Sequence, residues 1–139
     1  MAEPRYLVDT SVFARIDLDV VAERLEALAI SGRLWTCRVV DLELAYGTRQ
    51  RDVAGLIESR RELPEASITP AVLDRALQVA GLMTTKSLHR GAKPIDLVIA
   101  AAAEARGLAV LHYDEDYERI GKVTRQPTEW VAPKGSLEP

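Results

Sequence analysis

Short β-prone segments alternate with longer segments of helical periodicity along this chain. We expect strands at residues 5–8, 34–37 and 108–111, with smaller edge strands at 67–69 and 130–131. Between them, apolar residues recur every three or four positions, which predicts helices at residues 20–30, 39–46, 52–61, 70–87, 95–106 and 114–120. Strands separated by helices pair in parallel, and a parallel sheet is covered by helices on both faces. The sequence therefore predicts an α/β fold, a three-layer α/β/α structure with a central parallel sheet of about four or five strands.

The length suits one domain. With 139 residues, of which 47% are hydrophobic and 28% charged, the chain is large enough for one core and too small for two. We expect a single domain over residues 1–131. The polar segment 132–139, which contains proline and glycine, is expected to be a loosely held C-terminal tail.

The apolar segments are too short for a membrane protein. The longest uninterrupted apolar run, Leu97 to Ala103, is far below the roughly 20 residues that cross a bilayer. No basic segment followed by a long apolar stretch opens the sequence, and a single cysteine, Cys37, excludes an internal disulfide. We expect a cytoplasmic protein.

Four acidic residues are expected to meet at one edge of the sheet. Asp9 directly follows the first strand, and Asp114 comes soon after the strand at 108–111. Asp96 lies in the first turn of the most apolar helix. Glu43 lies on an apolar helix face, where no residue three or four positions away is basic, so its carboxylate needs another partner. Ligands of parallel sheets gather beyond the carboxyl ends of the strands, which makes this edge the place for a functional site.

Such a set of carboxylates favours a divalent metal ion. Converging carboxylates repel one another, and a bound cation keeps them ionised. Oxygen ligands without cysteine or histidine indicate Mg²⁺ or Mn²⁺ rather than zinc. Such an ion activates water and stabilises charge on a phosphate, which favours phosphodiester hydrolysis. The net charge of −3 does not exclude a polyanionic substrate, because 18 basic residues face only 16 acids once five carboxylates are assigned to the metal.

Four motifs resemble those of PIN-domain endoribonucleases, most closely the VapC-type toxins. They are Leu7-Val8-Asp9-Thr10-Ser11, the helix around Glu43, Pro94-Ile95-Asp96-Leu97 and His112-Tyr113-Asp114-Glu115-Asp116-Tyr117. The resemblance implies a PIN-like fold and a Mg²⁺- or Mn²⁺-dependent ribonuclease that acts on RNA, is inhibited by a cognate antitoxin and is often a homodimer or part of a larger toxin-antitoxin assembly.

The resemblance also assigns residues. It implies Asp9, Glu43, Asp96 and Asp114 as the catalytic core, with Asp116 as a fifth acid, and Asp9, Asp96, Asp114 and Asp116 as the metal ligands. Ser11 matches the small polar residue that supports the first aspartate. The roles of Asp114, Glu115 and Asp116 stay open relative to one another, and Tyr117 stands where the family often has Phe.

A basic loop precedes Asp96 and is a candidate for contacts to RNA phosphates. It contains Lys86, His89, Arg90 and Lys93, and we single out Arg90 and Lys93, together with Ser11, as substrate-binding candidates. The alternative is a solvated loop. On the helix at 52–61, the apolar Val53, Leu56 and Ile57 either pack within the chain or meet a second subunit or an antitoxin helix.

Simpler interpretations of the acids exist. Asp9 and Asp114 each suit a helix cap, and Asp96 suits the positive end of its helix dipole. One alternative function is a PIN-like binding module without catalysis, whose signature would be a missing acid. A second is an aspartyl-phosphate phosphatase or receiver-like domain. That chemistry calls for a second acid two residues beyond the nucleophile or a lysine at the end of a late strand. Thr10 and Ser11 follow Asp9, and His112 follows Leu111, so the sequence disfavours it.

Overall fold

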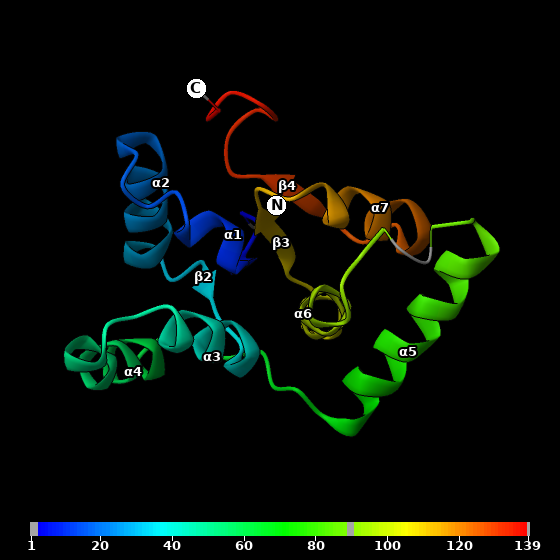
Figure 1. Ribbon diagram of the computed structural model, residues 1–139, viewed down its shortest axis with the longest axis horizontal. Helices are drawn as coiled ribbons and strands as arrows, with labels where there is room; N and C mark the ends of the chain where they lie inside the picture. Colours follow the sequence, from blue (N-terminus) through cyan, green and yellow to red (C-terminus); the bar gives the residue numbers. More distant parts are fainter. Residues whose placement is uncertain (1–2, 89–90, 139) are drawn as a thin grey trace.

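The computed structural model describes residues 3–88 and 91–138 of the chain. Four parallel strands form one sheet in the order β2-β1-β3-β4 (Figure 1). The strands are β1 (Tyr6–Val8), β2 (Leu34–Trp35), β3 (Ala109–His112) and β4 (Thr128–Trp130). The predicted α/β class with a parallel sheet of about four or five strands is thus confirmed.

The two central strands are buried throughout. Tyr6, Leu7 and Val8 of β1 pair with Ala109, Val110 and Leu111 of β3, and all six side chains are in the core. A strand covered on both faces is apolar at successive positions rather than at alternate ones. This explains why these two segments are the clearest strands in the sequence.

Helices cover both faces of the sheet. Seven α-helices and one short 3₁₀ helix lie in the described part of the chain: α1 (Thr10–Phe13), α2 (Asp19–Ile30), α3 (Arg38–Tyr46), η1 (Gln50–Asp52), α4 (Val53–Arg61), α5 (Pro70–Thr85), α6 (Pro94–Ala105) and α7 (Glu115–Thr124).

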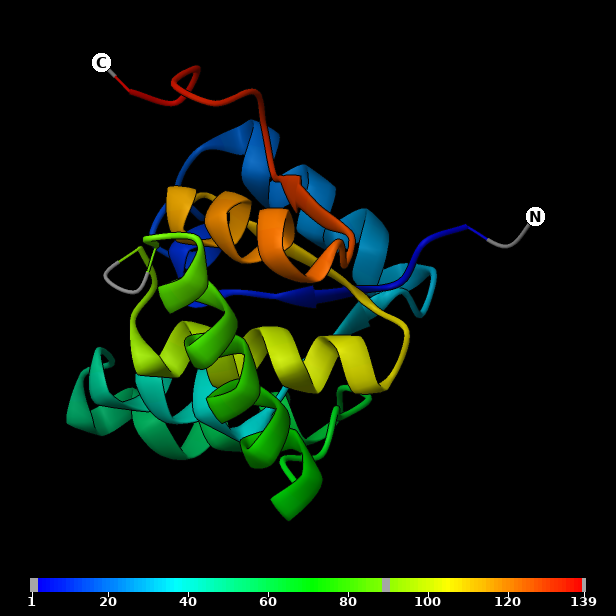
Figure 2. The same cartoon turned by 90° about the vertical axis from the view of Figure 1, so that its right-hand side faces the viewer.

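Two apolar clusters fill the space between these layers. On one face, Leu7 and Val110 pack with residues of α3, α5, α6 and α7. On the other face, Val8 and Leu111 pack with residues of α2. Figure 2 shows α6 and α2 on opposite sides of β1. The three-layer α/β/α arrangement predicted from the sequence is confirmed.

The most apolar helix, α6, is the centre of the larger cluster. Its Ile99 and the four alanines Ala100 to Ala103 are buried, and the helix packs against α5 and α3 (Figure 1). Four consecutive alanines allow neighbouring backbones to approach the helix closely on several sides. Pro94 occupies the first turn, where its missing N–H costs no helical hydrogen bond.

The expected edge strand at 67–69 is wrong. The chain makes an isolated parallel bridge two residues earlier, between Thr36 and Glu65. Thr69 is instead the N-cap of α5, where its hydroxyl accepts a hydrogen bond from the Val72 N–H. The last helix is also longer than expected, and ends where Arg125 adopts a left-handed backbone conformation with φ of 62°.

The segment after β4 returns toward the carboxyl end of the sheet. The Leu137 N–H donates to the Tyr113 hydroxyl at 3.1 Å, and the Lys134 amine lies 3.0 Å from the Glu115 carboxylate. The division into one domain over residues 1–131 and a loosely held tail over 132–139 stays a prediction. Within the described residues, no helix is both long and apolar enough to span a bilayer.

Candidate metal centre

Two of the predicted acids lie where the central strands end. Asp9 follows β1, and its N–H still donates to the Leu111 carbonyl at 2.9 Å. Its carboxylate caps α1 by accepting the Ser11 N–H at 3.0 Å. Asp114 follows β3 and caps α7 by accepting the Asp116 N–H at 2.9 Å. Because β1 and β3 are parallel neighbours, both carboxylates emerge at the same edge of the sheet.

The third acid reaches this edge from a helix N-terminus. Asp96 lies in the first turn of α6 and is only 3% exposed. Its carboxylate accepts the backbone N–H of Lys93 at 3.3 Å. This bond ties the side chain back to the residue before the helix and directs it toward the sheet edge.

The structure brings Asp96, Asp114 and Asp116 into one tight group. One carboxylate oxygen from each residue lies within 4.8 Å of the others. The donors are all carboxylate oxygens, which are the ligands preferred by hard divalent cations such as Mg²⁺. These three residues therefore fit a divalent metal ion, and the Lys93 amine lies against the same group, 2.9 Å from Asp116, 3.4 Å from Asp96 and 3.5 Å from Asp114.

Asp9 is joined to this group through a buried tyrosine. The Tyr117 hydroxyl donates to the Asp9 carboxylate at 2.6 Å and lies 3.5 Å from a carboxylate oxygen of Asp96. Burial, followed by the nearby carboxylates, raises the pKa of Tyr117 well above its usual value, so the hydroxyl remains a donor. The sequence indicates only that Tyr117 is an aromatic residue where the family often has Phe, because the role of its hydroxyl depends on a partner that lies far away along the chain.

Glu43 approaches the same edge from α3. Its carboxylate accepts a hydrogen bond from the Thr10 hydroxyl at 2.8 Å, and Thr10 is the neighbour of Asp9. The Thr10 hydroxyl is therefore the polar partner that the Glu43 carboxylate needs on its apolar helix face. Thr10 is a second site residue that sequence reasoning missed.

Burial and hydrogen bonds shift the pKa values of two of the acids. Burial, together with a hydrogen bond to Asp116, raises the pKa of Asp96 from 3.8 to about 7. Burial also acts to raise the pKa of Asp116, but hydrogen bonds with Asp96 and Lys93 outweigh it and lower the pKa overall. Without a metal, the pair therefore holds a proton near neutral pH, and a divalent cation would displace it.

The other predicted polar residues have different surroundings. Ser11 supports Asp9 through its backbone N–H, and its hydroxyl accepts the Tyr113 N–H at 2.9 Å, which links α1 to the end of β3. His112 is fully buried against Tyr117 and Trp130 and packs within the sheet. His89 and Arg90 lie outside the described residues.

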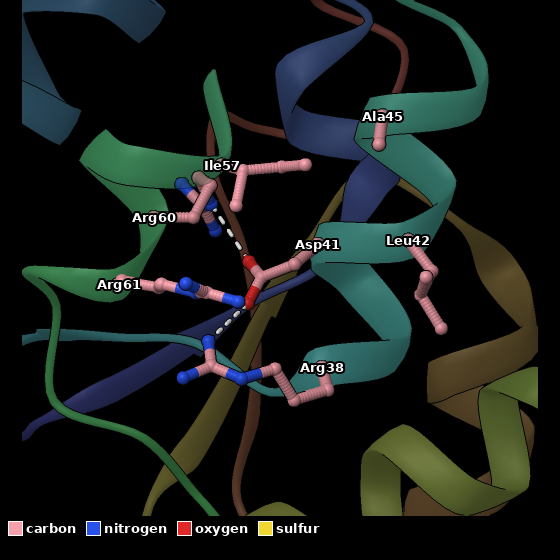
Figure 3. A pocket seen from close by; sticks show the side chains of 7 residues that line it. All are labelled: Arg38, Asp41, Leu42, Ala45, Ile57, Arg60 and Arg61. Atoms are coloured by element: carbon pink, nitrogen blue, oxygen red, sulfur yellow. Dashed lines mark hydrogen bonds and ion pairs between the residues drawn. The ribbon is translucent and has the colours of Figure 1, made fainter. Parts of the chain in front are cut away.

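A cavity between α3 and α4 is separate from the acidic edge. It encloses about 230 Å³ and is lined by Arg38, Asp41, Leu42, Ala45, Ile57, Arg60 and Arg61 (Figure 3). Figure 3 shows Arg38 and Arg60 converging on Asp41. A guanidinium nitrogen of each arginine lies 2.8 Å from an Asp41 carboxylate oxygen. Arg38 lies one helical turn before Asp41 on α3, whereas the buried Arg60 guanidinium reaches Asp41 from α4 and ties α4 to α3.

Comparison with known proteins places these features in a family. Residues 6–123 match the family model described as "PIN domain". The chain is 44% identical over 134 residues to Ribonuclease VapC21 of Mycobacterium tuberculosis, covering 95% of this chain and 97% of that protein. It is 40% identical over 139 residues to Ribonuclease VapC51 of the same organism, covering 96% and 98% respectively.

Solved structures have the same fold at lower identity. A chain of DNA-bound VapBC from Salmonella typhimurium superimposes with a TM-score of 0.74 at 19% identity, covering 94% of this chain and all of that chain. A chain of FitAB bound to a DNA fragment superimposes with a TM-score of 0.72 at 15% identity, covering 91% and 94%. Since the family model spans most of the sequence and the relatives match nearly all of it, the resemblance noted in the sequence is confirmed, and this chain belongs to the PIN domain family.

Proposed function

We propose that this chain is a Mg²⁺- or Mn²⁺-dependent endoribonuclease, the toxin of a toxin-antitoxin pair, which hydrolyses RNA phosphodiester bonds. The observation that carries the proposal is the group of Asp96, Asp114 and Asp116 carboxylates at the end of the sheet, with Asp9 beside it. Relatives of up to 44% identity that are named ribonucleases support the reaction. Similar folds in VapBC assemblies support the partnership with an antitoxin.

Asp96, Asp114 and Asp116 would hold the ion, with Asp9 as a further ligand. A bound divalent ion would supply a low-pKa water as nucleophile and offset the charge on the phosphate. The buried Tyr117 hydroxyl and the Ser11 N–H hold the two Asp9 oxygens in place. Glu43, held by Thr10, lies at the side of the site where its carboxylate accepts a proton from water or orients it.

Basic residues of the loop that precedes Asp96 in the sequence would bind the RNA. Lys93 is the described cation that contacts the three grouped acids together, and its side chain is 64% exposed. We propose Lys93 and Arg90 as contacts to the phosphate backbone, with Ser11 as a supporting residue. Such contacts position a substrate without reading its sequence.

The cavity between α3 and α4 suits an antitoxin segment. Leu42, Ala45 and Ile57 give it an apolar wall, and the exposed Arg61 gives its mouth a positive charge (Figure 3). An amphipathic antitoxin helix that carries a carboxylate matches both features. We propose this docking site for the antitoxin. A homodimer or larger assembly, and a cytoplasmic location, remain predictions from the family and the sequence.

The two alternative functions have less support. A binding module without catalysis would lack an acid, whereas this chain has all four predicted core acids, Asp9, Glu43, Asp96 and Asp114. In an aspartyl-phosphate enzyme, acetyl phosphate would label Asp9. Both Asp9 oxygens accept hydrogen bonds from within the protein, which disfavours an attacking carboxylate.

Cleavage of end-labelled RNA tests the proposal. We expect the purified chain to cut RNA with Mg²⁺ or Mn²⁺, and to lose activity with EDTA or with the Asp96→Asn substitution. Asp74→Asn is the matched control, because Asp74 is an exposed acid on α5. Undiminished cleavage in EDTA or by Asp96→Asn would contradict the proposed mechanism. If the RNA stays intact but the chain binds metal in a way that depends on Asp96, the metal centre is supported and the RNA tested is the wrong substrate. Absence of metal binding would favour the binding module.

A further inference from the structure

One side chain contacts all three grouped carboxylates. The Lys93 amine lies 2.9 Å from Asp116, 3.4 Å from Asp96 and 3.5 Å from Asp114. The same three residues are the ones whose oxygens lie within 4.8 Å of one another. The ammonium group therefore occupies the position relative to these acids that a small cation would take.

The local fold explains how Lys93 comes to this position. Lys93 is the residue that precedes α6, and its backbone N–H donates to the Asp96 carboxylate in the first turn. Its side chain then crosses to the N-terminus of α7, where Asp114 and Asp116 lie. Because the side chain is 64% exposed, it can leave the acids without disturbing the packed core.

Three carboxylates lie close together at this point, and a cation offsets their charge in the metal-free chain. Asp96 is buried, with 5% of its side chain exposed, and 17% of the Asp116 side chain is exposed. Arg119 contacts Asp116 at 3.0 Å, but the other carboxylate that it contacts is the exposed Glu115, so it pairs with only one member of the group. Lys93 is the described positive group shared by the three acids.

A metal ion and the ammonium group cannot both bind these oxygens. A divalent ion held by Asp96, Asp114 and Asp116 would lie within a few ångströms of the present amine position, where like charges repel strongly. The amine would have to move toward solvent as the ion entered. Removing the charge of Lys93 would then strengthen metal binding, because the ammonium group no longer competes with the ion, and would destabilise the metal-free chain.

We propose that Lys93 is a tethered counter-cation, which holds the acidic group together in the metal-free chain and is displaced when the divalent ion binds. This inference rests on the proposed metal-dependent function and goes beyond a substrate contact, because it assigns Lys93 a role before any RNA is present. Displacement also frees the amine for the phosphate contact proposed above.

Mn²⁺ binding to the metal-free chain, measured by calorimetry without RNA, tests the proposal. We expect Lys93→Met to bind Mn²⁺ about tenfold or more tightly than the unmodified chain, because the competing charge is gone. Lys93→Arg keeps the charge and should stay within about threefold. Lys134→Met is the matched control. It removes the same type of charge near the start of α7, where Lys134 contacts Glu115 and Glu118 and none of the three grouped acids. The Mn²⁺ affinity of this variant should therefore differ from that of the unmodified chain by less than about twofold.

Thermal unfolding gives a second readout. In EDTA, Lys93→Met should unfold at a lower temperature than the unmodified chain, and saturating Mg²⁺ should close that gap, because the ion replaces the lost counter-charge. Equal or weaker Mn²⁺ binding by Lys93→Met, or a gap that saturating Mg²⁺ leaves unchanged, would overturn the proposal while leaving the metal centre intact. If the unmodified chain binds no Mn²⁺, or binds it equally well with Asp96→Asn, the metal centre itself is wrong and the inference fails with it.

Discussion

Removing one oxygen atom at Tyr117 should measurably destabilise the metal-free chain. The Tyr117 side chain is fully buried, and its hydroxyl donates at 2.6 Å to the carboxylate of Asp9, which is 4% exposed. Tyr117→Phe keeps the ring and its packing, so the change isolates the hydroxyl. A hydrogen bond to a charged group contributes about 1.5 to 3 kcal/mol, and we expect a loss of about 2 kcal/mol in the free energy of unfolding.

The assay is urea unfolding in EDTA, followed by circular dichroism. The denaturation midpoint should fall while the dependence of unfolding free energy on urea stays the same, because the surface exposed on unfolding is unchanged. Tyr6→Phe is the control with the same chemical change. The Tyr6 hydroxyl donates at 3.0 Å to Glu129, whose side chain is 46% exposed, so water can replace that bond and the loss should stay below about 1 kcal/mol.

Two results would refute this reasoning. If Tyr117→Phe unfolds within about 0.5 kcal/mol of the unmodified chain, the hydroxyl does not stabilise Asp9 in the folded protein. If Tyr6→Phe loses as much free energy of unfolding as Tyr117→Phe, burial of the acceptor carboxylate does not determine how much each hydroxyl stabilises the protein.

Three further predictions concern other parts of the molecule. Burial lowers the pKa of His112 from 6.5 to about 4, so its contribution to stability is present above pH 6.5 and is lost as the pH falls toward 4. The raised pKa of Asp96 has the opposite effect on the pH dependence of stability, so the measurement uses an Asp96→Asn background. In that background, lowering the pH from 6.5 to 4 should reduce the free energy of unfolding by up to about 3 kcal/mol, and His112→Phe should flatten this pH dependence. An unchanged slope would show that His112 does not cause it. Thr10→Val removes the donor to Glu43 and should lower the rate of RNA cleavage about tenfold or more with little change in Mn²⁺ affinity; a normal cleavage rate would separate Glu43 from the reaction. Ile57→Lys places a charge in the wall of the α3–α4 cavity and should weaken capture of the chain by its antitoxin in a pull-down while RNA cleavage persists, whereas undiminished capture would exclude this docking site.

The main elements could be predicted because their signals are local. Residues 6–8 and 109–111 are apolar at every position, which marks strands buried on both faces, and the helices between them fix parallel pairing. The acids Asp9 and Asp114 could be placed at one edge because each follows one of these strands. Asp96 could be placed because Pro94 marks where its helix begins.

The remaining features depend on distances across the fold. Nothing near residue 117 in the sequence indicates that its hydroxyl meets Asp9, 108 positions away. The reach of Lys93 to Asp116 depends on how α6 and α7 lie together, and the Arg60 contact with Asp41 depends on how α4 lies against α3. The wrong strand at 67–69 has a local cause instead, because a β-prone threonine there serves as a helix cap.

The helix-cap and metal-ligand interpretations of the acids turn out to be compatible. The parallel strands β1 and β3 lead into helix N-termini at one edge of the sheet, where Asp9 caps α1 and Asp114 caps α7. Asp96 lies in the first turn of α6, which follows the loop after α5. Backbone N–H groups at these N-termini hold the carboxylates in place, and each carboxylate keeps lone pairs for a further partner.

The two roles can be separated at Asp114 by the choice of substitution. Asparagine is as good a cap as aspartate but carries no charge, whereas alanine can neither cap nor bind a metal. We therefore expect Asp114→Asn to fold with nearly unchanged stability in EDTA and to bind Mn²⁺ weakly, and Asp114→Ala to bind it weakly and also lose about 1 kcal/mol of unfolding free energy. Equal stability of the two variants would show that the cap contributes nothing. Mn²⁺ affinity retained by Asp114→Asn would show that this residue is a cap and not a ligand.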